Sequence, residues 1–389
     1  MKSVIVHDWL VSPIAGSEKT LREIHGLFPS PIYTLLKNEK KLEGSYFEGK
    51  ELIASFIQKL PFAQKYYRNY LPFFPLAIEQ FDLSAYDLIL SSSHCVAKGV
   101  ICHPDQLHIS YCHTPIRYAW DLMHPYLNDG PLRSGVKGAL ARFFLQYVRN
   151  WDVLSSNRVD AYIANSKYVA GRIRKYYGRS AHVIFPPVDI ESFQVCHQKE
   201  NFYLAASRMV PYKRLDLIVE AFSLMPDKKL VVIGSGPEEA NIKKKAHKNI
   251  EFLGFQSDSN LQLYLRKAKA FVFAAIEDFG ILPVEAMASG TPVIAFRKGG
   301  AMETVQEGVS GLFFEEQSIT SLQEAIRLFE TLEFDSAAIR SHAEQFSRER
   351  FRREFQEFVL KKYSFFKQGC VDADCDTSRR WGNSSLAPI

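Results

Sequence analysis

The stretch E-D-F-G-I-L-P-V-E-A-M-A-S-G-T-P-V-I, which runs from Glu277 to Ile294, decides the fold of this chain. Two short apolar runs, 269–275 (KAFVFAA) and 291–296 (TPVIAF), flank its centre, and both are typical of buried parallel strands. Between them, Pro283 suits the first position of a helix and Gly290 suits the helix exit. The sequence therefore predicts a strand, a turn, a helix and a second strand, which is the repeating unit of a parallel α/β sheet.

The predicted helix begins with a site that suits an anion. The N–H groups of Gly280, Ile281 and Leu282 would lie near its N-terminus, where phosphate groups bind well. Glu277 lies in the preceding loop and Glu285 falls in the predicted first turn, so both carboxylates can face one ligand. Because a carboxylate accepts hydrogen bonds from hydroxyl pairs, the pattern favours a phosphorylated sugar or ribose. The alternative is a helix N-terminus whose dipole simply favours acidic residues.

Length, composition and net charge limit the number of domains and the classes of ligand that the chain can have. A chain of 389 residues is too long for one core and predicts two domains. The chain is 47% hydrophobic and 23% charged, as in globular proteins, and its formal net charge is +5. This mild excess of positive charge favours an anionic ligand or an anionic membrane surface, and no nucleic-acid-binding motif is present.

The cysteines and the N-terminus predict the compartment. The cysteines show no C-x-x-C pair and no zinc spacing, so we expect free thiols in a reducing cytosol. They are Cys95, Cys102, Cys112, Cys196, Cys370 and Cys375. The start MKSVIVHDWL is predicted to enter a strand directly, so we expect no signal peptide there, and no apolar run is long enough to span a bilayer. We expect a cytoplasmic protein, and attachment to the inner face of a membrane stays open.

Further strand-to-helix turns carry polar residues. The strand 2–7 leads into S-P-I-A-G-S-E-K, in which Gly16 would let a phosphate approach the backbone closely. The strand 86–90 ends in three serines including Ser93, which could face a ligand or cap a helix. The strand 108–112 ends at His113, which Pro115 holds on a turn. Since parallel strands end at one edge of a sheet, these side chains are candidates for one site.

A basic pair follows the first strand of the second half. The turn 207–214 (SRMVPYKR) places Arg208 and Lys213 after the strand 201–206, where two cations can neutralise a leaving diphosphate. The alternative is a solvated basic turn. The tight turn at Gly234 and the strand end at Gly254 offer further backbone for a nucleotide, although the dinucleotide fingerprint is incomplete.

These motifs together resemble a known family. The two glutamates of E-D-F-G-I-L-P-V-E, with S-R-x-x-x-x-K-R-L-D from Ser207, resemble the signature of retaining GT-B glycosyltransferases of family 4. The string H-T-P-x-R-Y-x-W-D from His113 is similar to a subset that includes mannosyltransferases of cell-surface polysaccharide assembly. The resemblance spans nearly the whole chain. It implies an α/β protein of the GT-B fold, with two Rossmann-like doubly wound domains facing a cleft.

The expected boundaries follow from the hinge-like segment P-P-V-D at 186–189. We expect an acceptor-side domain at 1–187, a donor-side domain at 188–346, and a helix at 347–366 that crosses back to the first domain. The segment 368–389 lacks periodicity and is predicted to be disordered, so its D-A-D-C-D cluster is not expected to hold a metal at the cleft.

The resemblance assigns roles to individual residues. Catalytic roles fall on His113, Glu277, Arg208 and Lys213. Donor binding falls on Gly16, Arg208, Lys213, Gly234, Gly254, Phe279, Gly280, Ile281, Leu282 and Glu285. Acceptor contacts fall on Ser93, Arg117 and Tyr118, although Tyr118 could equally pack and Arg117 could pair with Asp121 on the surface.

The implied reaction transfers a sugar from a nucleoside diphosphate with retention, without a metal or another cofactor. The expected donor is GDP-mannose, and the expected acceptor is a saccharide linked to a polyprenyl lipid, as in surface polysaccharide or glycolipid synthesis. The aromatic and basic segment 50–81 suits a lipid-facing surface, and core packing explains it equally well. The segment 134–154 has apolar residues at helical spacing, so we expect a long helix packed on the sheet, and its other face, with Lys137, Arg142 and Arg149, could contact a membrane. The alternatives are a UDP-sugar donor or a non-catalytic nucleotide-sugar-binding subunit. A sugar-nucleotide epimerase would lack both motifs.

Overall fold

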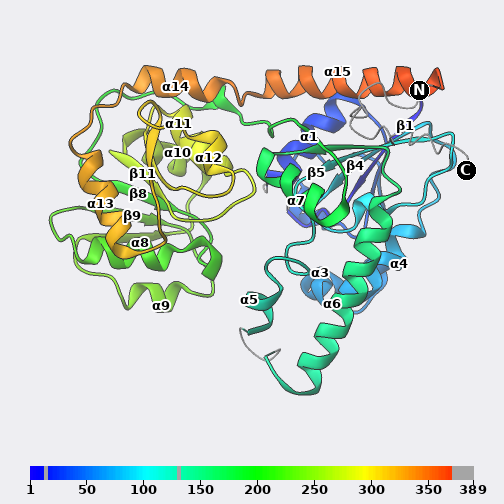
Figure 1. Ribbon diagram of the computed structural model, residues 1–389, viewed down its shortest axis with the longest axis horizontal. Coiled ribbons are helices and arrows are strands. Elements are labelled where there is room, and N and C mark those ends of the chain that lie inside the picture. The colour runs from blue at the N-terminus through cyan, green and yellow to red at the C-terminus, as the bar shows by residue number, and fades with distance from the viewer. Residues whose placement is uncertain (13–15, 129–132, 370–389) are drawn as a thin grey trace, which may run out of the picture.

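The computed structural model describes residues 1–12, 16–128 and 133–369, and it contains two parallel sheets in separate domains (Figure 1). The first sheet has the order β3-β2-β1-β4-β5-β6-β7 and the second has the order β10-β9-β8-β11-β12-β13. In both sheets the direction of winding reverses beside the first strand, between β1 and β4 and between β8 and β11. Open α/β sheets bind their ligands at this position. The predicted pair of Rossmann-like domains is confirmed.

The strands and helices alternate along the chain. The strands are β1 Ser3–His7, β2 Ile32–Thr34, β3 Leu52–Ala54, β4 Leu88–Ser93, β5 Leu107–Cys112, β6 Ala161–Ala164, β7 His182–Val183, β8 Tyr203–Ala206, β9 Leu230–Ile233, β10 Ile250–Gly254, β11 Ala270–Phe273, β12 Val293–Phe296 and β13 Gly311–Phe314. The α-helices are α1 Gly16–Leu27, α2 Glu39–Leu42, α3 Ala63–Tyr66, α4 Phe74–Glu79, α5 Met123–Asn128, α6 Gly135–Ser156, α7 Lys167–Tyr177, α8 Leu215–Ser223, α9 Glu239–Lys243, α10 Asp258–Lys267, α11 Ile281–Ala288, α12 Ala301–Thr304, α13 Ile319–Phe329, α14 Ser336–Glu344 and α15 Arg348–Lys367. Short 3-10 turns occur at η1 Phe56–Lys59, η2 Tyr67–Phe73, η3 Ala97–Gly99, η4 Ile190–Ser192 and η5 Pro211–Lys213.

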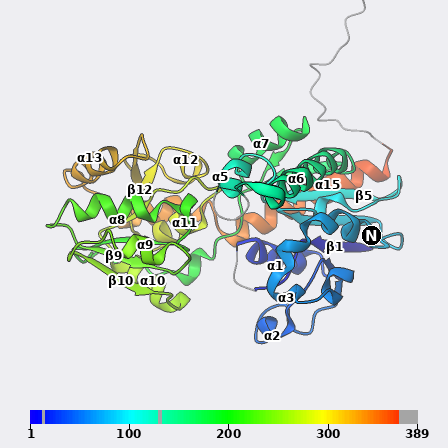
Figure 2. The same ribbon diagram turned by 90° about the horizontal axis from the view of Figure 1, so that it is seen from below.

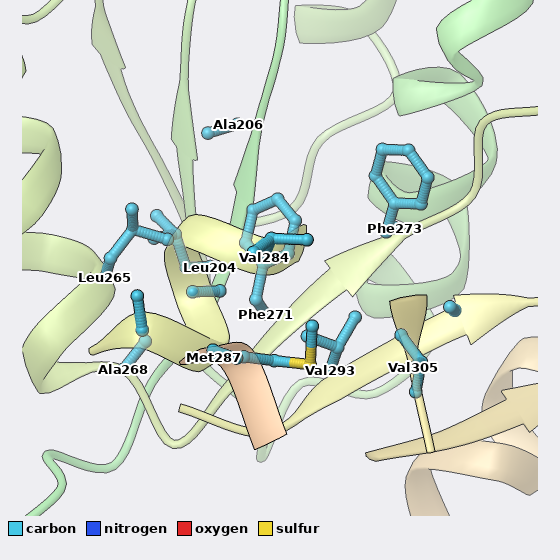
Figure 3. Close-up of a cluster of buried hydrophobic side chains, with 14 of the residues drawn as sticks. Leu204, Ala206, Leu265, Ala268, Phe271, Phe273, Val284, Met287, Val293 and Val305 are labelled. Carbon is cyan, nitrogen blue, oxygen red and sulfur yellow. The ribbon is translucent and has the colours of Figure 1, made fainter. Parts of the chain in front are cut away.

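Each sheet is buried on both faces, because alternate side chains of one strand enter different cores. In β1, Val4 and Val6 join one cluster and Ile5 joins another on the opposite face. In the second domain, α11 inserts Val284 and Met287 against Phe271 of β11 (Figure 3). This packing fixes α11 on the sheet, so its N-terminus is held at the edge where β8 and β11 end.

Helix α11 differs slightly from the prediction. It begins at Ile281 rather than at Pro283, so Pro283 is the third helical residue and Glu285 lies one turn into the helix. Pro283 is tolerated there because the first-turn N–H groups have no partner inside the helix. Gly290 ends the helix as expected, with φ of +68° and its N–H donating to the carbonyl of Met287 at 2.9 Å.

The final helix α15 belongs to the first domain. Its Phe351 and Phe355 pack beside Tyr111 of β5, and its Arg352 donates to the buried Glu23 of α1 at 2.6 Å. The two connecting segments run side by side, since the N–H of Val188 donates to the carbonyl of Phe346 at 2.9 Å. Figure 1 shows α14 and α15 along one edge of both domains. The sequence interpretation missed α14.

Some of the segments considered in the sequence lie outside the described residues. Residues 13–15 of the first turn lie outside the described residues, as do 370–389 of the predicted disordered tail with Cys370 and Cys375. The four cysteines that the structure does describe are free thiols. Over the described ranges, no helix combines the length and the apolarity needed to cross a bilayer.

Buried histidines in the first sheet predict a pH-dependent stability. His108 is fully buried in β5, its Nε2 lies 2.8 Å from Ser91 Oγ, and burial lowers its pKa from 6.5 to about 4. Between those pH values only the unfolded chain binds the proton, so the free energy of unfolding falls as the pH falls below 6.5. From pH 7 to pH 5 this histidine alone should cost about 2 kcal/mol.

The measurement is urea unfolding at pH 7 and pH 5. His108→Gln should lose less stability on acidification than the parent chain, by about that 2 kcal/mol. His103→Gln changes an exposed histidine outside the sheet and is the matched control. Equal pH dependence in the parent and in His108→Gln would contradict the assignment.

Candidate active site

A cavity of about 630 Å³ is lined by residues of both domains. Its walls come mainly from the turns after β4, β5, β6, β8 and β11 and from the starts of α1 and α11. The lining residues are Gly16, Ser17, Lys19, Thr20, His94, His113, Thr114, Arg117, Asn165, Pro186, Ala206, Ser207, Arg208, Tyr212, Lys213, Phe273, Glu277, Asp278, Phe279, Gly280, Ile281, Leu282 and Glu285. The cavity thus lies at the winding reversal of both sheets.

Most of the residues predicted from the sequence meet in this cavity. From the first domain they are Gly16, His113 and Arg117, and from the second they are Arg208, Lys213, Glu277, Phe279, Gly280, Ile281, Leu282 and Glu285. Phe279 is also a core residue, since it packs against Phe185 and Phe346 near the hinge. The structure does not place Gly234, Gly254, Ser93 or Tyr118 in the lining.

These four residues support the turns behind the cavity. A Cβ on Gly234 would lie 1.9 Å from the carbonyl oxygen of Ser207, so this glycine lets β9 pack against the turn that carries Arg208. The N–H of Gly234 donates to the carbonyl of Gly254 at 2.8 Å. Ser93 accepts from the N–H of His113 at 2.8 Å through its carbonyl, and the hydroxyl of Tyr118 lies 2.8 Å from Cys95 Sγ.

Lys213 and Glu277 form an ion pair at the ends of β8 and β11. Burial by itself would lower the pKa of Lys213, but the adjacent Glu277 outweighs it and raises the pKa, so the lysine carries its charge at neutral pH. Arg208 lines the same cavity and forms no ion pair with any residue that the structure describes. The site therefore offers two cations beside the N-terminus of α11.

That N-terminus is shaped for an anion. Gly280 is its cap with φ of +88°, a conformation that favours glycine, and it leaves the N–H groups of Ile281 and Leu282 in the first turn. The helix dipole adds partial positive charge at the same place. With Arg208 and Lys213 nearby, the arrangement can hold a diphosphate.

The second glutamate pairs across the cavity. Glu285 lies 3.0 Å from Nζ of Lys19 on α1, and while burial raises the pKa of Glu285, Lys19 acts against that shift. Helices α1 and α11 also approach directly, because a Cβ on Gly16 would lie 2.7 Å from Cδ1 of Ile281. No sequence pattern marks Lys19, since its partner lies in the other domain.

A group of histidines forms the wall contributed by the first domain. His113 Nε2 lies 2.9 Å from Ser92 Oγ, and burial, with the nearby His94 and His7, lowers the pKa of His113 well below its usual value. The ring is therefore neutral at pH 7. Asp8 accepts four backbone N–H groups at 2.6–2.9 Å and lies 3.2 Å from His94 Nδ1. The sequence interpretation missed His94 and Asp8, although an acidic residue directly after a buried strand was a usable signal.

Among the residues that the structure describes, no three His, Cys, Asp or Glu side chains lie close enough together to bind one metal ion. The charges of the cavity come instead from Arg117, Arg208, Lys19 and Lys213 and from the carboxylates named above.

Comparisons with known proteins agree with this architecture. A model of the family described as Glycosyltransferase Family 4 matches residues 33–192, and one described as Glycosyl transferases group 1 matches residues 189–349. The chain is 25% identical to the alpha-1,3/1,6-mannosyltransferase ALG2 of Saccharomyces cerevisiae over 60% of this chain and 55% of that protein. It is 28% identical to a GDP-mannose-dependent alpha-(1-6)-phosphatidylinositol monomannoside mannosyltransferase of Mycobacterium tuberculosis, over 41% of this chain and 50% of that one.

The chain spans about half the length of these curated relatives. Among solved structures, Anabaena HepE in complex with UDP and glucose superposes with a TM-score of 0.66 at 19% identity, covering 92% of this chain and 100% of that one. This likeness shows the fold. The motifs, the cavity and both family models together show that the chain belongs to glycosyltransferase family 4, with the GT-B fold.

Proposed function

We propose that the protein transfers mannose from GDP-mannose to a lipid-linked saccharide, with retention at the anomeric carbon and without a metal ion. One observation carries the proposal: a single cavity joins Arg208, Lys213 and the N-terminus of α11 with a carboxylate on either side, Glu277 and Glu285. This set matches a nucleoside diphosphate sugar, because cations and amides suit the diphosphate and carboxylates suit hydroxyls.

In the proposed reaction, the bond between the anomeric carbon and the diphosphate oxygen breaks while the acceptor oxygen attacks from the same face. The acceptor hydroxyl proton passes to the leaving diphosphate oxygen, so no separate protein base is needed. Arg208 and Lys213 stabilise the charge that develops on the leaving group, together with the amides of Ile281 and Leu282. The two cations take the place of a divalent metal ion.

The remaining polar groups orient the donor. The neutral His113 and the carboxylate of Glu277 would hold sugar hydroxyls from opposite domains, and Glu285 would hold the ribose. In the structure these two glutamates pair with Lys213 and Lys19, so the donor must share or replace those contacts when it binds.

Two observations support GDP-mannose as donor and a lipid-linked saccharide as acceptor: the names of the relatives and the H-T-P-x-R-Y string from His113. Both relatives described above are named as mannosyltransferases, and the name of one includes GDP-mannose and a phosphatidylinositol mannoside. The similarity to each covers part of the chain, which makes GDP-mannose a proposal for this protein. The proposed place of action is the inner face of a membrane.

An exposed apolar face on α6 supports the lipid-linked acceptor. Val136, Leu140, Phe143, Tyr147 and Leu154 are all exposed, and at about 100° per residue they share one narrow stripe of the helix. Helix α6 extends away from the first sheet (Figure 1), so the expectation that these five side chains pack on the sheet is wrong. The sequence from 133 to 151 contains four cations and no acidic residue, and although Arg149 turns inward to donate to the carbonyl of Ala119, the net positive charge of this part of the helix suits an anionic lipid surface.

The test of transfer uses purified protein with radiolabelled GDP-mannose, and separately with UDP-sugars, against lipid-linked acceptors, with EDTA in one arm. We expect mannose transfer that EDTA does not reduce and that Glu277→Ala abolishes. Transfer from UDP-sugars alone would contradict GDP-mannose as the donor. Loss of transfer in EDTA would contradict a metal-independent reaction. Binding of a nucleotide sugar without transfer would indicate a non-catalytic subunit.

The membrane contact has its own test, which is sedimentation with vesicles of phosphatidylcholine with or without phosphatidylglycerol. Phe143, which is 65% exposed, should contribute apolar burial, so Phe143→Ser should weaken binding to the anionic vesicles about tenfold. Leu224 is exposed to the same extent on the second domain, and Leu224→Ser should have no effect. Equal binding of both variants would contradict the proposed contact.

A further inference from the structure

Charged side chains join the two domains at the edge of the cavity. Asp278 directly follows Glu277 in the second domain, and Arg172 lies on α7 of the first. Arg172 Nη1 donates to Asp278 Oδ1 at 2.7 Å, and its Nη2 donates to Asp121 Oδ1 at 2.5 Å. Arg117 Nη1 lies 3.7 Å from the other oxygen of Asp278. The loop that carries Glu277 is thus held by side chains of the opposite domain.

The same guanidinium also reaches the loop that carries His113. Arg172 Nη1 donates to Thr114 Oγ1 at 2.5 Å, and Thr114 directly follows His113. One side chain therefore contacts the neighbours of the two residues that are proposed to orient the sugar from opposite domains. A planar guanidinium with several fixed donors can set such a geometry, whereas a lysine ammonium cannot span the same acceptors.

The start of α7 adds three hydrogen bonds between the domains. Ser166, which caps α7, donates from Oγ to the carbonyl of Asp278 at 2.5 Å. Glu303 of α12 accepts the N–H groups of Lys167 and Tyr168 at 2.7 and 2.8 Å. First-turn N–H groups lack partners inside the helix, and the helix dipole favours a carboxylate there. Figures 1 and 2 both place α7 on the side of its domain toward α12.

The ion pair between Arg172 and Asp278 is shielded from water. The side chain of Arg172 is 8% exposed and that of Asp278 is 16% exposed. An ion pair with this burial and several hydrogen bonds is broken at greater cost than a surface pair, because removing one partner leaves the other charge buried. The contacts of Ser166, Arg172, Asp278 and Glu303, called here the α7 clamp, are therefore built to hold the domains together.

We propose that Arg172 is a positioning residue that couples closure of the two domains to the alignment of His113 with Glu277. Its effect on rate rests on the proposed function, while its effect on closure does not. When the α7 clamp forms, the loop that carries Glu277 packs against the first domain. When the clamp opens, the nucleotide site on the second domain stays intact, but the two sugar-orienting residues separate.

The experiment compares Arg172→Met, Arg172→Lys and Asp278→Asn with Arg174→Met, which changes an exposed arginine of the same helix. Closure is measured as the radius of gyration by small-angle X-ray scattering, with and without GDP. We expect the first three variants to shift to a larger radius and Arg174→Met to match the parent chain. An unchanged radius in Arg172→Met and Asp278→Asn would overturn the proposal.

Kinetics then separate positioning from general damage. Arg172→Met should lower kcat about 30-fold, while the Kd for GDP changes less than about threefold, since misplaced reacting groups slow the chemical step. Arg172→Lys should recover part of the rate. The double variant Arg172→Met/Asp278→Asn should be no slower than Arg172→Met, because both changes break one interaction. Additive losses, or equal losses of GDP binding and kcat, would overturn the positioning role.

Scattering and kinetics together distinguish failure of the α7 clamp from failure of the proposed function. If the parent chain transfers no sugar but Arg172→Met opens the domains, the clamp stands and the proposed function fails. If transfer occurs and the scattering does not change, the function stands and the clamp fails.

Discussion

Replacing Lys213 with methionine should lower kcat/KM for sugar transfer about 1,000-fold, which corresponds to about 4 kcal/mol of transition-state stabilisation. Lys213 lies inside the cavity, paired with Glu277, and keeps its charge because of that pair. Its removal takes away a cation that is proposed to stabilise the leaving diphosphate. It also leaves the negative Glu277 without its partner, beside a donor that carries further negative charge. Both effects act most strongly as the diphosphate departs.

The loss should therefore exceed that of Arg208→Met, for which we expect about 100-fold, because Arg208 is exposed and water screens its charge. Steady-state kinetics over a range of donor concentrations, with GDP affinity measured separately by calorimetry, provide the comparison. Most of the loss for Lys213→Met should appear in kcat rather than in GDP affinity.

A double-variant cycle tests the pairing. Lys213→Met/Glu277→Gln should retain more activity than the product of the two single losses predicts, because the second change removes the unpaired carboxylate. A value of kcat/KM within fivefold of the parent for Lys213→Met would contradict both the proposed leaving-group role and the interpretation of the cavity.

The features predicted correctly from the sequence are local ones. The strand, turn and helix around Glu277, and the basic turn at Arg208, are encoded by neighbouring residues, and parallel strands must end at one edge of their sheet. Residues from four such turns therefore meet in one cavity, as the motifs implied. Within the segment around Glu277, the start of α11 was misplaced, because Pro283 is compatible with any position in the first turn.

The features that the sequence did not predict depend on how the domains meet. Lys19 pairs with Glu285, and Arg172 pairs with Asp278, although the partners lie in different domains. Charges of this kind occur throughout the chain, and no spacing marks which of them will pair. For the same reason, Asp278 was overlooked, although its neighbours Glu277 and Phe279 were both predicted as site residues. Closure of two domains is a tertiary property, so its contacts can be identified only in the folded molecule.

Replacing Gly300 with alanine should lower kcat/KM about 100-fold, although the substitution lies outside the cavity lining. Gly300 has φ of −63° and ψ of −23°, which alanine adopts freely, so the effect is purely steric. An added Cβ would lie 2.3 Å from the Cα of Phe279 and 2.4 Å from its carbonyl oxygen. These are backbone atoms, so the whole loop from Glu277 to Gly280 must move.

That loop is fixed to Gly300 by a hydrogen bond, since the N–H of Gly300 donates to the carbonyl of Glu277 at 2.8 Å. A shift of about 1 Å would move Glu277 and the α11 amides together, and displacements of this size commonly cost about 100-fold in rate. Overpacking should also lower the free energy of unfolding by about 1–3 kcal/mol, which leaves the protein folded at 25 °C. Kinetics and urea unfolding measure the two effects. Gly26→Ala on α1 is the control, because its Cβ would meet only the hydroxyl of Tyr46 at 3.9 Å. If Gly300→Ala kept the activity of that control, the loop would not need its observed position for catalysis.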